Sequence, residues 1–209
     1  MSRHPFLDAA DATLALLQEP EVAARWDEPS ALAEMTVGAL AEHLASQVVS
    51  GARGLTDEAW SPRGERIELL EHYRRSAWVG ADIDTPANVG IRESAAAAAA
   101  AGPDAVVERV RAALASVDPW PADPRPTVSM PHWAWSMATD DFLTTRMMEM
   151  VVHADDLCAG LELETPVFPR SVSAPVFALL VGVAEDKHGQ AAVTRALTRR
   201  ERAGSIVVF

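Results

Sequence analysis

Apolar residues recur at every third or fourth position through most of this chain, which places them on one face of a helix. Residues 5–18 are an example, with apolar side chains at Phe6, Ala10, Leu14 and Leu17. The same pattern extends over 36–51, 65–79, 94–101, 104–117, 140–160, 172–188 and 190–200. The pattern predicts four or five main helices, joined by connections of very different length.

Two short segments break the helical pattern and indicate strands. Residues 127–130 and 205–209 are rich in β-branched side chains, so we expect them to pair with each other. Residues 119–135 combine five prolines with three tryptophans, which is typical of an ordered crossover or of a lid over a pocket. We therefore predict an all-α fold for residues 1–209 as a single domain: a four-helix bundle with a long crossover connection and a short C-terminal β pairing.

The composition of the chain says more about its possible binding partners than about its fold. The chain has 209 residues, 49% of them hydrophobic, which is enough to bury a full core. Its net charge of −12, with no basic cluster to offset it, argues against nucleic acid and against anionic membrane surfaces as partners. No leader-like or membrane-spanning stretch is evident, and the single cysteine, Cys158, excludes an intrachain disulfide. These features predict a cytoplasmic protein, with a buried, inert thiol at Cys158.

The segment 140–160 carries the candidate chemistry. At helical spacing one stripe of polar side chains includes Arg146, Glu149, His153 and Asp156, and almost all of its neighbours are apolar. A buried carboxylate costs several kcal/mol, as an order of magnitude, unless a cation compensates it. Glu149 and His153 stand four residues apart and can reach one ion, so the stripe predicts a metal site.

A catalytic zinc takes three protein ligands and leaves one position open, so a third ligand is needed from another segment. The candidates are His43, His72, His132 and His188. His43 is modestly preferred, because it lies at the edge of the apolar face of a well-capped helix. In the alternative interpretation, Glu149 and His153 only form ion pairs, with each other and with Arg146 or Arg53. Spacing alone leaves both interpretations open.

Several stretches resemble one family. Residues 145–157 (TRMMEMVVHADDL) resemble the long-helix motif of the mycothiol-dependent maleylpyruvate isomerase N-terminal domains, a branch of the DinB-like four-helix bundles. Residues 36–47 (TVGALAEHLASQ) resemble that family's second-helix motif, and residues 26–30 and 197–209 are also similar. The likeness covers nearly the whole chain and is most specific in residues 145–157.

The resemblance implies a function as well as a fold. Carried over residue by residue, the family's zinc ligands correspond to His43, Glu149 and His153. The family implies zinc, or another divalent metal such as Ni²⁺, together with mycothiol as thiol cosubstrate. The expected activity is that of a transferase or isomerase, in which a metal-activated thiolate attacks a small electrophilic substrate. For Arg146 and Asp156, on the same stripe, two roles stay open: hydrogen bonds that orient the metal ligands, as from Asp156 to the free imidazole N–H of a ligand histidine, or helix capping and salt bridges.

One departure separates this chain from the isomerase of the family. That enzyme has a second, C-terminal domain that supplies a basic residue to the active site, whereas this sequence stops at Phe209. We therefore expect that domain to be absent and leave the substrate open. A non-catalytic metal-binding or regulatory bundle, and a purely structural bundle, remain as alternatives. The oligomeric state is also open, with a dimer as one alternative.

Overall fold

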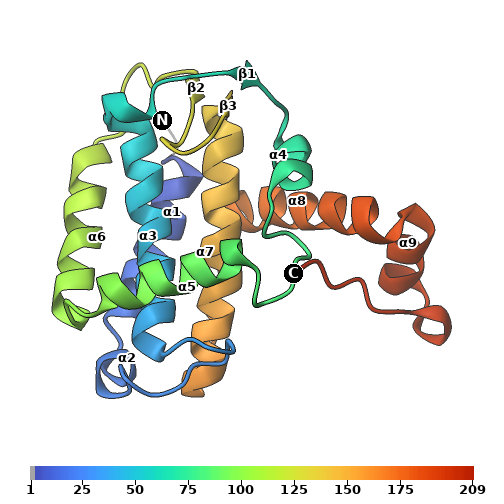
Figure 1. The fold of residues 1–209 in the computed structure, drawn as a ribbon, viewed down its shortest axis with the longest axis horizontal. Coiled ribbons are helices and arrows are strands. Elements are labelled where there is room, and N and C mark those ends of the chain that lie inside the picture. Colours follow the sequence, from blue (N-terminus) through green and yellow to red (C-terminus); the bar gives the residue numbers. More distant parts are fainter. Residues whose placement is uncertain (1–2) are drawn as a thin grey trace.

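The computed structural model describes residues 3–209 and is built around four helices that run alongside one another (Figure 1). These are α1 (Pro5–Leu17), α3 (Val37–Thr56), α6 (Pro103–Val117) and α7 (Thr139–Leu161). Helix α3 packs against both α6 and α7, and α1 contacts all three. The fold is therefore the predicted all-α bundle, with long connections before and after α6, at 57–102 and 118–138.

The remaining elements surround this bundle. The other helices are α2 (Pro20–Ala24), α4 (Leu69–Arg75), α5 (Pro86–Ala99), α8 (Arg170–His188) and α9 (Gln190–Thr198), with 3-10 turns η1 (Glu58–Trp60) and η2 (Arg200–Arg202). Three short strands, β1 (Glu65–Arg66), β2 (Thr127–Val128) and β3 (Trp135–Ala138), complete the structure. None of the helices in residues 3–209 is long and apolar enough to cross a membrane.

Helix α3 begins as predicted and ends later than predicted. The Thr36 hydroxyl accepts a hydrogen bond from the Ala39 backbone N–H at 3.1 Å, which caps the helix. The helix then passes through Gly51 and Gly54, although glycine is a poor helix former. A Cβ at Gly51 would lie 2.2 Å from the Phe6 ring, and one at Gly54 would lie 2.6 Å from the Phe142 ring. Both glycines therefore let aromatic rings approach the helix, and this packing outweighs their low helix propensity.

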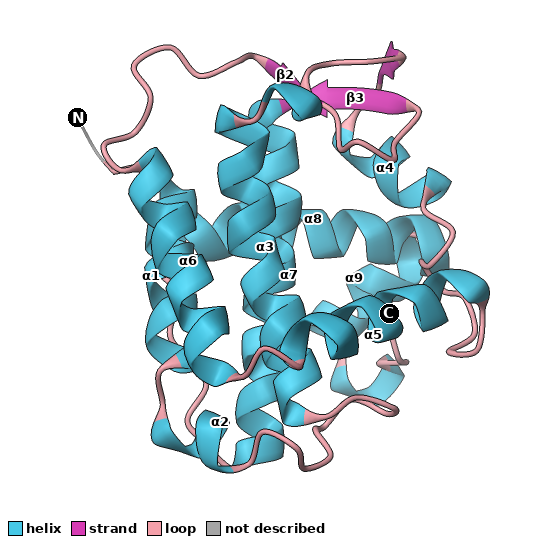
Figure 2. Ribbon diagram, turned by 60° about the vertical axis from the view of Figure 1, so that its left-hand side comes forward, coloured by secondary structure: helices cyan, strands magenta, loops and turns pink. Residues whose placement is uncertain are grey.

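The short β pairing is present, but the predicted partner was wrong. Strand β2 pairs antiparallel with β3, while β1 pairs parallel with β3 (Figure 2 shows β2 and β3 across one end of the bundle). The C-terminal residues 205–209 are not in a strand. Instead the side chains of Lys187 and His188 hydrogen-bond the Val208 and Val207 carbonyls, each at 2.8 Å. β-Branched composition alone could not distinguish a strand from an extended tail held by side chains.

The segment 65–79 was predicted as one helix and is divided. Its first residues form β1, and only Leu69–Arg75 are helical as α4. Gly64 has φ +64°, and a Cβ there would lie 2.0 Å from the Ala134 carbonyl oxygen. The close approach of these two backbones directs the chain along β3 before α4 begins. Helix α5 differs in the opposite sense, since it begins at Pro86, upstream of the alanine run that predicted it.

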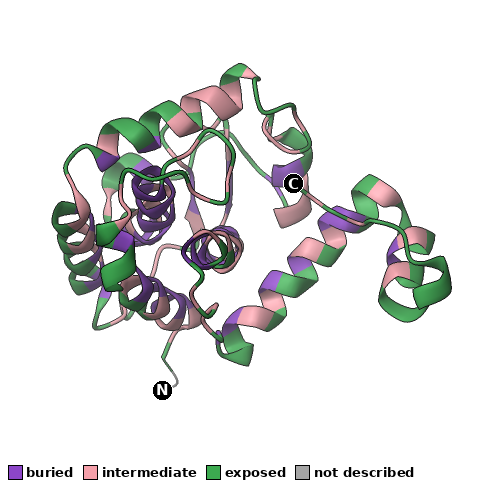
Figure 3. Ribbon diagram, turned by 90° about the horizontal axis from the view of Figure 1, so that it is seen from below, coloured by how far each residue is buried: buried purple, intermediate pink, exposed green. Residues whose placement is uncertain are grey.

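Helices α8 and α9 form an arm that projects from the bundle (Figure 1). The start of α8 packs against α7 and α1, and α4 also contacts α8. Seen from below, buried residues concentrate in the bundle helices, whereas α9 is mostly exposed (Figure 3). The core that can hold a buried charge is thus the interior between α3 and α7, not the arm.

Candidate metal centre

His43 of α3 and Glu149 and His153 of α7 meet where these two helices pack against each other. Their donor atoms all lie within 4.8 Å of one another. The Glu149 Oε2 atom lies 3.1 Å from His153 Nε2 and 3.6 Å from His43 Nε2. Glu149 is buried, and the two histidines are partly buried. Two imidazole nitrogens from different helices therefore converge on one carboxylate oxygen.

The spacing of these atoms fits a tetrahedral ion. Zinc ligands at about 2.1 Å from the metal are separated from one another by about 3.4 Å along the tetrahedron edge. The two Nε2–Oε2 distances, 3.1 and 3.6 Å, bracket that value. Two histidines and one glutamate are also a known ligand set for catalytic zinc with a fourth position open. The donor set therefore suits a divalent ion.

Asp156 orients the His153 ring. Its Oδ2 lies 2.9 Å from His153 Nδ1, one helical turn along α7. An Nδ1–H donated to this carboxylate leaves the Nε2 lone pair directed at the Glu149 side, which is the arrangement found behind many metal-binding histidines. Asp156, expected from the stripe, is thus in contact with a candidate ligand.

Arg146 reaches the site through Gln47. The Arg146 guanidinium donates to the Gln47 side-chain oxygen and, at 3.0 Å, to the Thr145 hydroxyl. The Gln47 amide nitrogen in turn donates to the His43 carbonyl at 3.0 Å and lies 3.5 Å from His43 Nε2. Gln47 was missed by the sequence analysis, although its position four residues after His43 puts it on the same helical face.

The protonation of Glu149 and His153 depends on the charges that surround them. Burial on its own raises the pKa of Glu149, but hydrogen bonds from His153 and His43 and the charge of Arg146 hold it well below the usual range. Burial lowers the pKa of His153, but Asp156 and Glu149 outweigh it and raise that pKa to about 9. In the absence of a metal, the site is therefore an imidazolium facing carboxylates, and a divalent ion would replace that proton.

The other candidate histidines lie elsewhere. The His72 ring packs on Trp133 with centroids 4.6 Å apart, His132 lies beside the same tryptophan, and His188 bonds the Val207 carbonyl. Within residues 3–209 the structure groups His43, and none of these three, with Glu149 and His153.

Of the ion pairs in the alternative to a metal site, the one between Glu149 and His153 is formed, at 3.1 Å, whereas those with the two arginines are not formed within residues 3–209. Arg53 pairs with Asp57 at 2.7 Å, away from Glu149. Arg146 makes no carboxylate ion pair in the described part of the chain.

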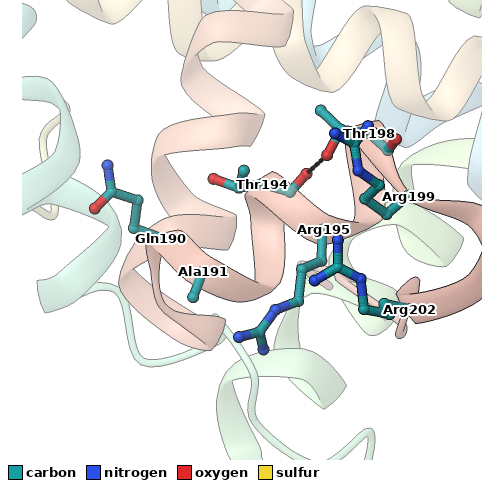
Figure 4. A pocket seen from close by; sticks show the side chains of 7 residues that line it. All are labelled: Gln190, Ala191, Thr194, Arg195, Thr198, Arg199 and Arg202. Carbon is teal, nitrogen blue, oxygen red and sulfur yellow. Dashed lines mark hydrogen bonds between the residues drawn. The ribbon is translucent and has the colours of Figure 1, made fainter.

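A hollow of about 380 Å³ lies on the arm, away from the metal centre, and has different chemistry (Figure 4). Its wall comes from α9 and η2 and includes Arg195, Arg199 and Arg202. The Thr198 hydroxyl that faces it donates to the Thr194 carbonyl at 2.6 Å. With arginines and without carboxylates or imidazoles in its lining, this hollow is unsuited to a cation.

Comparison with known proteins agrees with the geometry. A family model for the mycothiol maleylpyruvate isomerase N-terminal domain matches residues 6–158, well over half of the chain. The matched region includes His43, Glu149 and His153 and ends before α8. Searches of curated proteins and of solved structures found no match. The chain therefore belongs to the mycothiol maleylpyruvate isomerase N-terminal domain family.

Proposed function

We propose that His43, Glu149 and His153 hold a divalent metal, zinc, and that the protein uses it to bind a small thiol of the mycothiol type for transfer or isomerisation of a small electrophilic substrate. The convergence of three donors from α3 and α7 on one point carries the proposal. Membership in the family supports the choice of thiol.

The bound metal would supply one chemistry, the lowering of the thiol pKa so that the cosubstrate is held as thiolate at neutral pH. The protein's own side chains would hold the metal and orient its ligands. Glu149 contributes the negative charge that makes a buried cation tolerable, and Asp156 keeps the His153 ring in the ligating orientation. Gln47 hydrogen-bonds the His43 carbonyl, and Arg146 hydrogen-bonds the Gln47 side chain, so these two residues hold the site in place beside His43.

The nucleophile has to come from outside the chain. Cys158, the single cysteine, is fully buried, and its Sγ faces the Glu164 carbonyl oxygen at 3.7 Å. Burial raises the pKa of its thiol, which disfavours the reactive thiolate. A small external thiol is therefore the more suitable partner for a metal with an open position.

Metal analysis tests the first half of the proposal. We expect purified protein to bind about one equivalent of zinc, and His43→Ala, Glu149→Gln and His153→Ala to lose it. His188→Ala is the matched control, because His188 bonds a carbonyl of the C-terminal tail outside the cluster. Unchanged zinc stoichiometry in all three ligand variants would refute the metal centre.

Cobalt substitution tests the second half. Addition of a small thiol to the cobalt-loaded protein should produce a thiolate-to-cobalt charge-transfer band. A protein that binds cobalt but shows no such band with any small thiol would instead be a non-catalytic metal-binding or regulatory bundle.

A further inference from the structure

The end of the arm carries positive charge on an acidic protein. Residues 189–209 contain four arginines and one glutamate, so their side chains carry a charge of +3, whereas the whole chain has a net charge of −12. Three of these arginines, Arg195, Arg199 and Arg202, line the hollow of about 380 Å³ (Figure 4). Like charges around one hollow repel one another, and an anion between them removes that repulsion. The arrangement therefore favours an anionic ligand.

The three arginines reach the hollow from two elements. Arg195 lies in the last turn of α9 and Arg199 follows it at the end of that helix, four residues later and hence on the same face. The C-terminal end of a helix favours cations by itself, which is enough to explain these two. Arg202 lies beyond the helix, in η2, and lines the same hollow. The helix end does not account for this third guanidinium.

These arginines have few partners in the protein. Arg195 is exposed, and its side chain makes no hydrogen bond or ion pair within the described part of the chain. Arg199 donates to the Thr198 carbonyl at 2.9 Å, and Arg202 Nε lies 3.6 Å from the Glu201 carboxylate. That last pair is more than half exposed on both sides, so water screens it and it is weak. Most of the guanidinium donors are thus available to a ligand.

The rest of the lining adds neutral hydrogen-bonding groups. The Gln190 amide and the Thr194 hydroxyl both line the hollow, and neither side chain is hydrogen-bonded to another described residue. Gln190 begins α9 and so lies at the opposite end of the lining from the arginines (Figure 4). A volume of about 380 Å³ is within the range of about 300–1,000 Å³ that is typical of small-molecule sites. The hollow therefore suits a small polar molecule with its anionic group at the arginine end.

The number of arginines distinguishes between anions. A carboxylate has a single charge and two oxygens in one plane, which one guanidinium can satisfy with two parallel hydrogen bonds. A phosphate ester carries a charge of about −1.5 to −2 and three acceptor oxygens that point in different directions. Three guanidinium groups match the second anion better. A polyanion such as nucleic acid would also meet the acidic remainder of the chain, which repels it.

We propose that Arg195, Arg199 and Arg202 bind the phosphate group of a small molecule in the hollow at the end of the arm. In a phosphate ester, Gln190 and Thr194 contact the organic part. Free phosphate shares the same chemistry at the arginine end. None of the lining residues belongs to the metal cluster, so the inference goes beyond the proposed metal chemistry and does not depend on it.

The test titrates the ¹⁵N-labelled full chain with glycerol 3-phosphate, inorganic phosphate and glycerate at constant ionic strength. We expect the backbone amide resonances of residues 190–202 to shift saturably with glycerol 3-phosphate. Glycerate, which presents a carboxylate on a similarly short chain, should bind more weakly. Tighter binding of the ester than of inorganic phosphate would identify a phosphorylated molecule as the ligand, and the reverse would identify free phosphate. Glycerate binding as tightly as either phosphate probe would refute the phosphate site.

Arginine variants show whether the hollow itself binds the probe. Arg195→Gln should weaken binding of the tighter phosphate probe about fivefold, the effect of one hydrogen-bonded group, and Arg202→Gln should act in the same direction. Arg111→Gln is the matched control, because it removes the same charge from a half-exposed side chain of α6 outside the hollow. Equal weakening by Arg111→Gln would show that only the net charge attracts the anion. Shifts that do not saturate would show an adventitious ion only, and either result refutes the site.

Discussion

Two interior histidines of this protein, His153 on α7 and His72 on α4, have pKa values shifted in opposite directions. The pKa of His153 is raised to about 9, and that of His72 is lowered to about 4. Burial lowers the pKa of both rings. His153 has two carboxylates within hydrogen-bonding distance, and they raise its pKa. His72 packs against aromatic rings instead, and the positive charge of Arg146 lowers its pKa further.

The contrast shows that burial alone does not decide the charge of an interior histidine; its neighbours do. The His153 region carries a proton that a metal could displace. The His72 ring, with its lowered pKa, stays neutral at neutral pH. The two regions are connected by the aromatic contacts of Trp133 with His72 and with Phe142 of α7.

The largest expected effect is the pH dependence of metal affinity. Because the pKa of His153 is about 9, a metal binding at neutral pH must displace one proton from this ring. Zinc affinity should then rise about tenfold per pH unit between about pH 6 and 9, or about 1000-fold in total. Chelator competition across this range measures the slope, and calorimetry in buffers of different ionisation enthalpy measures the released proton. An affinity that is flat with pH would show that His153 does not bind as a ligand.

The next effect concerns His72 and protein stability in acid. The folded-state pKa of about 4 lies below the unfolded value of 6.5, so the folded state binds fewer protons between these two values. The contribution of neutral His72 is therefore complete above about pH 6.5 and is lost as the pH falls toward 4. This loss of stability amounts to roughly 3 kcal/mol.

Urea unfolding of the metal-free protein at a series of pH values measures this loss. The variant His72→Phe should lose less free energy of unfolding than wild type over the same range. Parallel curves for the two proteins would mean that His72 is not kept neutral by its surroundings.

A smaller effect on zinc affinity should distinguish Asp156 from its neighbour Asp155 on α7. Asp156→Asn removes the carboxylate behind His153 and should lower zinc affinity about 10- to 100-fold at neutral pH. Asp155→Asn is the matched control, since Asp155 accepts from the Thr165 hydroxyl at 2.7 Å and faces away from the metal donors. Equal affinity of both variants would remove Asp156 from the site.

The smallest effect tests whether the arm influences the His72 region. Arg74 of α4 makes two hydrogen bonds to Asp186 of α8, at 2.8 and 2.9 Å, but it is 52% exposed. Arg74→Gln should therefore reduce the free energy of unfolding only slightly, because water and salt screen an exposed ion pair. The His72 pKa, followed by NMR, should stay low. A shift back toward 6.5 would show that this ion pair holds α4 in place.

The sequence by itself determined most of the helices and the stripe on α7. Within one helix, the repeat of 3.6 residues fixes which side chains share a face, so the grouping of Glu149, His153 and Asp156 followed directly from spacing. The burial of Cys158 also followed from local sequence, because its neighbours on the helix are apolar.

Only the tertiary structure decided which histidine stands opposite Glu149, where α3 ends, and what β2 pairs with. Each of these depends on how elements distant in the sequence pack together, as when Gly51 and Gly54 admit the rings of Phe6 and Phe142. That the Tyr73 hydroxyl finds no hydrogen-bond partner within residues 3–209 could not be foreseen for the same reason, since α4 is a short helix placed by its contacts with its neighbours. Spacing along one helix is set by local backbone geometry, whereas the register between helices is set by side-chain packing that a linear pattern does not contain.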